Sequence, residues 1–170
     1  MNVALLRAIN VGANRKVPMA DLRALFAELG ATQVRTYIQS GNVVYEGALD
    51  PQVVAAALQA RFGFAIPVVI RTAASLEALV NPWPDEDPSI VGVVFLGAAP
   101  SPERLSALDL ARIAPDELRA VGADLWIRCP TTFAKTKITV DWLERHLETT
   151  ATTRNVRTAR ILADMANGRA

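Results

Sequence analysis

The chain has 170 residues, of which 51% are hydrophobic and 21% charged, and its net charge at pH 7 is +1. A globular chain of this size buries about two-thirds of its unfolded surface, so its stability requires neither a metal nor a disulfide. The single cysteine excludes an internal disulfide, and no apolar stretch approaches the roughly 18 residues of a membrane span. Residues 1–9 also lack the basic segment and cleavage site of a signal peptide. We therefore expect a cytoplasmic protein with no membrane partner.

The first 80 residues alternate between strand-like and helix-like hydrophobic patterns. The expected elements are a strand at 3–9, a helix from Pro18 to 29, strands at 34–39 and 43–45 around the turn Ser40-Gly41-Asn42, a helix at 50–62 and a strand at 66–71. Proline suits a first helical turn, and Gly30 is a typical helix terminator. The order βαββαβ is that of a ferredoxin-like arrangement.

The same pattern begins again after a proline-rich and acidic segment. We expect a short helix at 72–80, a strand at 90–96, a helix at 102–110, strands at 118–121 and 125–128 around Gly122, and a helix at 138–147 capped by Thr139. We interpret residues 149–153 as a threonine-rich loop and Asn155 as the cap of a last helix that runs to about residue 167.

These elements predict an α/β protein of the α+β type. It would consist of two ferredoxin-like βαββ-type halves packed together, with mixed, mainly antiparallel sheets. The predicted boundaries are 1–80 for the first half, 81–89 for a connector, and 90–170 for a second, related half with the C-terminal helix. The similar spacing of the two hairpins supports this repeat, although sequence identity between the halves is negligible.

Charge is distributed unevenly along the chain. Residues 1–45 hold five Lys or Arg and two Asp or Glu, residues 46–119 hold five and ten, and residues 120–170 hold eight and five. The two ends are therefore basic and the middle is acidic. This asymmetry is consistent with an anion site built by both ends, and equally with ordinary scatter of surface charge.

The loop between the first strand and the first helix is the first candidate binding segment. It contains Asn10, Asn14 and Lys16 and leads into a helix N-terminus, where backbone N–H groups and the helix dipole favour anions. It matches neither a Walker motif nor a dinucleotide fingerprint. The alternative is a capped turn with solvated basic side chains. Arg7 interrupts the apolar run before this loop, so it either satisfies buried acceptors or points into a ligand groove.

Established catalytic arrangements find little support. Ser40 lies in a hairpin turn and not in a nucleophile elbow, and the only histidine, His146, lies on an ordinary amphipathic helix. One histidine and one cysteine do not make a zinc site, so no metal and no cofactor are expected. Tyr37 beside Arg35 would suit base stacking, but the aromatic-rich motif of RNA-recognition modules is absent. Basic and hydroxyl residues also gather at 135–137 and 152–155, before predicted helix starts.

Three strings taken together resemble a known family. They are Leu5-Leu6-Arg7-Ala8-Ile9-Asn10-Val11-Gly12 with Lys16-Val17-Pro18-Met19, then Tyr37-Ile38-Gln39-Ser40-Gly41-Asn42-Val43, and finally Thr153-Arg154-Asn155. They are similar to the bacterial domain of unknown function family 1697, over essentially the whole chain. The family usually has Gly-Gly where this sequence has Gly12-Ala13, so the second position of that loop does not require a glycine here.

The resemblance implies a two-part α/β fold with ferredoxin-like halves, but no established activity, cofactor or catalytic residue. It groups eight polar residues, which makes a shared groove more plausible: Arg7, Asn10, Lys16, Gln39, Ser40, Asn42, Arg154 and Asn155. With Asn14 and Lys137 these form our candidate ligand-binding set. We expect Arg7, Asn10, Gln39, Asn42 and Arg154 to surround one depression.

Three functions remain open at this point. The first is binding of an anionic small molecule, nucleotide-like ligand or nucleic acid. The second is an enzyme that positions a phosphoryl or acyl substrate without a metal, by orientation and electrostatic stabilisation. The third is a non-catalytic interaction module, in which the polar residues only hold the halves together. A bound ligand separates the first two from the third, and turnover separates the enzyme from the binder. The sequence leaves monomer and weak homodimer open.

Overall fold

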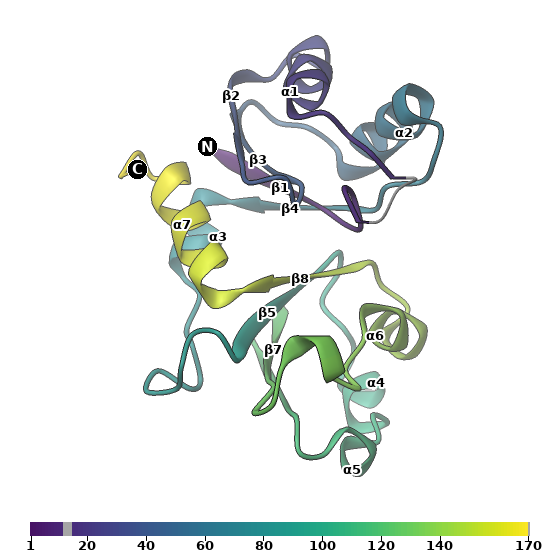
Figure 1. The fold of residues 1–170 in the computed structure, drawn as a ribbon, viewed down its shortest axis with the longest axis vertical. Coiled ribbons are helices and arrows are strands. Elements are labelled where there is room, and N and C mark those ends of the chain that lie inside the picture. The colour runs from purple at the N-terminus through teal and green to yellow at the C-terminus, as the bar shows by residue number, and fades with distance from the viewer. Residues whose placement is uncertain (12–14, 170) are drawn as a thin grey trace. The chain divides into compact units, whose positions relative to one another are not determined.

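A computed structural model describes residues 1–11 and 15–169 (Figure 1). It contains two four-stranded antiparallel sheets, and the chain divides into two compact units. Unit 1 comprises Met1–Ala78 and Ile161–Ala170, and unit 2 comprises Leu79–Arg160. The second boundary falls within the last helix, α7 (Val156–Ala166).

Unit 1 has the βαββαβ element order expected from the sequence. Its elements are β1 (Asn2–Leu6), α1 (Met19–Glu28), β2 (Thr32–Tyr37), β3 (Asn42–Glu46), α2 (Pro51–Phe62), β4 (Val68–Thr72) and α3 (Ala73–Glu77). The strand order is β2-β3-β1-β4, with every pair antiparallel. This is the ferredoxin-like topology, with α1 and α2 packed on one face of the sheet (Figure 1).

Unit 2 repeats this topology with more irregular connections. Its elements are β5 (Val91–Leu96), α4 (Pro102–Ser106), α5 (Leu110–Ile113), β6 (Glu117–Val121), β7 (Asp124–Arg128), the 3₁₀ turn η1 (Phe133–Lys135), α6 (Val140–Leu147), β8 (Ala151–Asn155) and the start of α7. The order β6-β7-β5-β8 matches that of unit 1 strand for strand. The predicted fold class, two ferredoxin-like halves with antiparallel sheets, is therefore confirmed.

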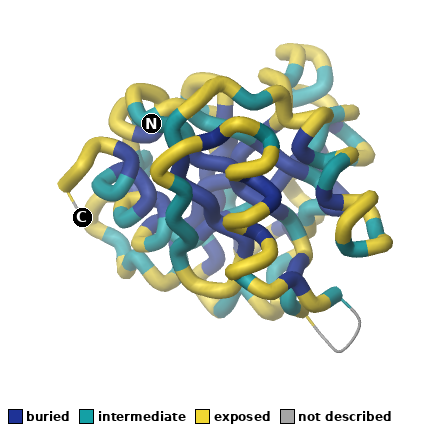
Figure 2. The backbone as a smooth tube through the Cα atoms, turned by 90° about the horizontal axis from the view of Figure 1, so that it is seen from above, coloured by how far each residue is buried: buried dark blue, intermediate teal, exposed yellow. Residues whose placement is uncertain are grey.

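The residues of each core are those that the side-chain alternation of strands and the 3.6-residue period of helices place on one face. In unit 1, Ala4 and Leu6 on β1 face the same cluster as Leu22 and Phe26 on α1. In unit 2, Leu143 on α6 packs into the equivalent cluster. Side chains on the alternate strand positions, such as Val3 and Leu5, are also buried. The exposed positions fall mainly on loops and outer helix surfaces (Figure 2).

The helix starts behave as their sequences predict. Asp50 caps α2, because its carboxylate accepts hydrogen bonds from the N–H groups of Gln52 (2.7 Å) and Val53 (3.2 Å). Thr139 caps α6 through a bond from the N–H of Trp142 at 3.2 Å. Asn155 accepts a bond from the N–H of Arg157 at 2.7 Å, at the start of α7.

Three expectations about elements were wrong. Residues 151–153 belong to β8 and not to a loop, because β8 pairs with residues 92–96 of β5. The helix expected at 102–110 is two short helices, since Asp109 caps a new one and breaks the first pattern. The first strand ends at Leu6, since Ala8 and Asn10 adopt positive φ angles. Arg7 therefore follows the strand instead of interrupting it.

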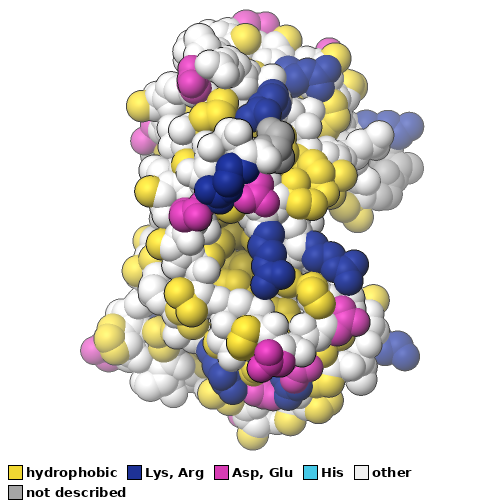
Figure 3. Space-filling model, turned by 90° about the vertical axis from the view of Figure 1, so that its left-hand side faces the viewer, with side chains coloured by type: hydrophobic (Ala, Val, Ile, Leu, Met, Phe, Trp, Pro, Cys, Tyr) yellow, Lys and Arg dark blue, Asp and Glu magenta, His cyan; other side chains and the backbone are white. Residues whose placement is uncertain are grey.

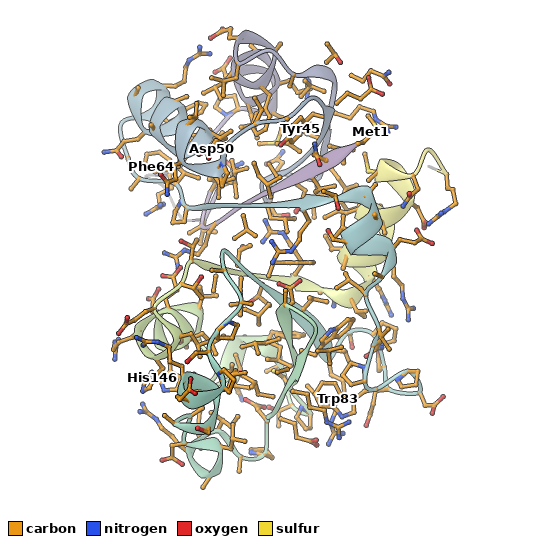
Figure 4. The ribbon with its side chains drawn as sticks, turned by 180° about the vertical axis from the view of Figure 1, so that it is seen from behind. Met1, Tyr45, Asp50, Phe64, Trp83 and His146 are labelled. Atoms are coloured by element: carbon orange, nitrogen blue, oxygen red, sulfur yellow. The ribbon has the colours of Figure 1, made fainter. Side chains whose placement is uncertain are left out.

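Tyr45 gives a testable feature of the unit 1 core (Figure 4). Its ring packs against Phe26 with centroids 5.3 Å apart, and its hydroxyl is buried without a hydrogen-bond partner among the described residues. Burial raises the pKa of Tyr45 to about 12.

We expect Tyr45→Phe to leave the free energy of unfolding at pH 7 unchanged or to raise it by up to about 1 kcal/mol, because no hydrogen bond is lost. An unfolded tyrosine ionises near pH 10 and the folded one near 12, so ionisation favours unfolding as pH rises through that range. The variant should not lose stability through this ionisation at alkaline pH. Urea unfolding at pH 7 and 10.5 measures both effects, and a loss above 1 kcal/mol at pH 7 would reveal a partner for the hydroxyl.

Candidate functional site

Asn10 joins the loop after β1 to the β2–β3 hairpin. Its side-chain amide donates to the carbonyls of Gln39 (2.8 Å) and Val17 (3.1 Å), and its Oδ1 accepts from the N–H of Val17 (2.8 Å). Its own N–H donates to the carbonyl of Arg15 at 2.8 Å. Asn10 adopts φ 54°, a conformation that asparagine tolerates better than most residues. The amide side chain is therefore a structural link that fixes two loops.

Asn42 performs a similar task inside the hairpin. It is fully buried at the first position of β3, and its side-chain amide donates to the carbonyl of Tyr37 (3.1 Å) and to Oγ of Ser40 (3.0 Å). Gly41 precedes it with φ 82°, and the N–H of Leu6 donates to the Gly41 carbonyl at 2.8 Å. These contacts hold the hairpin turn against the end of β1.

A cavity of about 400 Å³ lies where these two segments meet. Its lining consists of Asn10, Lys16, Val17, Pro18, Met19 and Gln39. The side chains of Lys16 and Gln39 are exposed, and neither makes a hydrogen bond within the described chain. Helix α1 begins here after Pro18, which provides no side-chain cap for its first N–H groups. The cavity thus offers one ammonium group, one amide group and a helix N-terminus, with Asp21 in the first turn as the opposing charge.

Other candidate residues near this loop have different surroundings. The guanidinium of Arg15 donates to the carbonyl of Ala65 (2.7 Å) and stacks on Phe64 at 4.8 Å from its centroid, so it binds the α2–β4 connection (Figure 4). Arg7 is half-buried, and its backbone N–H donates to the carbonyl of Pro67 at 3.0 Å. Asn14 lies outside the described residues.

The C-terminal candidates belong to unit 2. Arg154 on β8 is 8% exposed, and its guanidinium donates to Oγ1 of Thr152 (2.8 Å) and the carbonyl of Thr153 (2.9 Å). Burial lowers the pKa of Arg154 to about 10. Asn155 donates to the carbonyl of Pro88 at 2.9 Å. The Lys137 ammonium donates to the carbonyl of Ala114 at 3.2 Å.

Unit 2 contains its own cavity, of about 530 Å³, which the sequence analysis did not predict as a separate site. It is lined by Ile127, Phe133, Ala134, Thr136, Ile138, Thr139, Val140, Thr153 and Asn155. The Phe133 ring lies over Gly92, where a Cβ atom would come within 3.0 Å of the ring. The hydroxyl of Thr136 donates to the buried carboxylate of Asp116 at 2.7 Å and accepts from the N–H of Ile138. Of its lining residues, the sequence analysis had singled out Asn155 as a ligand-binding candidate, Thr139 as a helix cap, and Thr136 and Thr153 within two clusters of basic and hydroxyl residues.

The described residues limit several other functions. No helix among them combines the length and apolar composition needed to cross a membrane. Within residues 1–11 and 15–169, no group of three His, Cys, Asp or Glu side chains is placed to hold a metal ion. On the face drawn in Figure 3, basic and acidic side chains are intermixed with apolar ones.

Comparison with known protein families confirms the resemblance that the motifs indicated. The sequence model of the family described as "Protein of unknown function (DUF1697)" matches residues 1–126. The chain belongs to this family. The first two motifs of the predicted resemblance lie within the matched residues, whereas Thr153-Arg154-Asn155 lies beyond them.

The fold is also similar to that of a solved structure. It is that of a conserved bacterial protein from Streptococcus pneumoniae, with a TM-score of 0.73 and 21% sequence identity over 98% of this chain and 97% of that one. At this identity the likeness concerns the fold alone. A comparison with curated proteins found no match.

The structure brings together part of the predicted set. Asn10, Lys16 and Gln39 line one cavity, and Ser40 and Asn42 adjoin it in the same hairpin. Lys137, Arg154 and Asn155 lie in unit 2. Their convergence with the unit 1 residues stays a prediction.

Proposed function

We propose that the protein binds a small phosphorylated, nucleotide-like anion in the unit 1 cavity. The observation that carries this proposal is that the polar residues at the cavity are of two kinds, those bonded within the fold and those exposed to solvent. Asn10 and Asn42 use their amides to fix the loop and the hairpin, while Lys16 and Gln39 line the cavity with exposed side chains. A fixed frame with exposed polar groups around a cavity supports a binding role, since preorganisation lowers the cost of binding.

An anion suits the chemistry of this cavity. Lys16 is the only cationic side chain among its described lining residues, and it lies three residues before Met19, the uncapped start of α1. Backbone N–H groups at a helix N-terminus favour phosphate and carboxylate groups. The volume of about 400 Å³ falls within the usual range of small-molecule sites.

The enzyme reading remains an alternative proposal. It would use the same groups to orient a phosphoryl or acyl substrate. The module reading, in which the polar residues hold the two halves together, gains no support from Asn10 and Asn42, because both side chains bond to groups of their own unit. Turnover assays on phosphate esters discriminate the enzyme from the binder.

We predict that Lys16→Gln weakens binding of ribose 5-phosphate at least about tenfold, because a charge-assisted contact is lost. The melting temperature of the unliganded protein should stay the same, since Lys16 is exposed. Titration calorimetry at low ionic strength measures the affinity, and added salt should weaken the parent's binding.

The matched control is Lys135→Gln, which removes another exposed lysine from unit 2 with the same change of net charge. It should bind ribose 5-phosphate like the parent. Equal affinity of both variants and the parent would refute an anion site at Lys16, and equal weakening in both would reduce the effect to net charge.

A further inference from the structure

We propose that the unit 2 cavity is a second binding site, for a small, neutral and mainly apolar molecule that carries a hydroxyl or carbonyl group. This inference is independent of the anion site proposed for unit 1, because all of the residues that line the cavity belong to unit 2. Its volume of about 530 Å³ falls within the usual range of small-molecule sites.

The cavity occupies a place that unit 1 fills with an apolar side chain. On β8, Thr153 forms the middle pair with Val94 of β5. Ile70 has the same position in unit 1, where it forms the middle pair of β4 with Ala4 of β1. Ile70 packs against the unit 1 core, whereas Thr153 lines the cavity. The repeated topology therefore places a smaller, polar side chain where the first unit completes its core.

A shorter helix also leaves this place open. Helix α6 has 8 residues, whereas its counterpart α2 has 12, and the difference is about one turn. Residues 63–67 connect α2 to β4 and residues 148–150 connect α6 to β8, so the missing turn lies at the start of α6. There the chain forms the longer segment 129–139, part of which is one wall of the cavity.

Contacts within unit 2 hold this wall in place. The hydroxyl of Thr136 donates to the carboxylate of Asp116 (2.7 Å), which also accepts from the N–H of Lys137 (3.3 Å). The Phe133 ring packs over Gly92 of β5, where any larger residue would clash with it. Glycine within a strand often marks such a close approach. The cavity is thus formed before a ligand arrives, which lowers the cost of binding.

The lining determines the chemistry of the ligand. Five of the lining side chains are hydrocarbon, and no charged residue is among those described. Two hydroxyl groups retain hydrogen-bonding capacity. Thr139 accepts from the N–H of Trp142 and still has its own O–H to donate, and the hydroxyl of Thr153 makes no hydrogen bond within the described chain. The side chains of Thr136 and Asn155 are engaged within the fold. The two available hydroxyls suit one hydroxyl or carbonyl group of a ligand.

An anion fits this cavity poorly. Lys137 does not line it, and its ammonium group donates to the carbonyl of Ala114. Asp141 in the first turn of α6 opposes the positive end of the helix dipole. A charge that moves from water into an apolar cavity without a partner is costly, so the lining favours a neutral ligand.

The test is a titration of the whole chain with 2-naphthol, which is neutral at pH 7, and with 2-naphthoate, which has the same rings and a carboxylate. We expect saturable binding of 2-naphthol and at least about tenfold weaker binding of 2-naphthoate. Thr153→Ile introduces the residue found in unit 1 and fills the cavity. It should weaken 2-naphthol binding at least about tenfold at an equal or higher melting temperature. Thr153→Val keeps the shape but removes the hydroxyl, and should weaken binding about three- to tenfold.

The matched control is Thr32→Ile, the same change at an exposed position on β2 of unit 1. It should bind 2-naphthol like the parent. Equal binding by Thr153→Ile and Thr32→Ile, tighter binding of 2-naphthoate than of 2-naphthol, or no saturable binding of 2-naphthol would each overturn the assignment. If Thr153→Ile does not fold, Thr153→Val decides, and affinity equal to that of the parent would refute the hydroxyl contact.

Discussion

Replacing Gly41 by alanine should destabilise the protein by about 2–5 kcal/mol. A Cβ atom at this position would lie 2.8 Å from Cβ of Leu6 and 3.1 Å from the side chain of Ile9. Both partners are buried beside β1, so neither moves cheaply, and such overpacking typically costs about 1–3 kcal/mol. The φ of 82° adds about 1–2 kcal/mol for any residue with a side chain. Urea unfolding of the whole chain measures the sum.

Gly63 provides the matched control for this substitution. It has nearly the same φ, 80°, and a Cβ atom added there would meet no described atom within 4 Å. Gly63→Ala should therefore cost only the conformational part, about 1–2 kcal/mol. The difference between the two variants isolates the contact with β1. Equal losses would show that the hairpin does not press against Leu6.

Asn42→Asp should destabilise the protein by about 3–5 kcal/mol at pH 7, the usual cost of an uncompensated buried charge. The substitution keeps the shape of the side chain but turns a donor into an acceptor that faces the carbonyl of Tyr37. Because the site is fully buried, the pKa of the new carboxyl group should rise above its usual value.

The sign of the pH dependence follows from this rise. The folded variant would retain its proton to higher pH than the unfolded chain, so its stability should fall as pH rises above about 4 and recover in acid. Asn42→Ala removes the same two hydrogen bonds without adding a charge, and its loss relative to the parent should not depend on pH. Denaturation curves at pH 4.5 and 7 compare the variants. A pH-independent loss for Asn42→Asp would mean that water or a cation reaches the site.

Much of the fold could be predicted because its signals are local. The cap at Asp50, the glycine turns and the alternating strands specify elements within a few residues, and the repeated order specifies the topology. The strand β8 escaped prediction for the opposite reason. Its polar sequence has weak strand character, and pairing with β5 over residues 151–155 determines its conformation.

The candidate site was predictable only as a set of residue types. Asparagines at positions 10 and 42 suggested ligand contacts, but their amides bond to backbone groups as much as 29 residues away. Such partners are set by tertiary structure and leave no mark in the local sequence. Lys16 and Gln39 do line one cavity with Asn10, and their role in ligand binding stays a prediction.

The most direct test of the central proposal is an NMR titration of the ¹⁵N-labelled protein with AMP. Amide shifts should change in a saturable manner at Lys16 and Met19, beside the start of α1, and at Gln39, which lines the same cavity. Saturable changes confined to the unit 2 cavity, around Thr136 and Thr153, or no changes at all, would contradict a nucleotide site in unit 1.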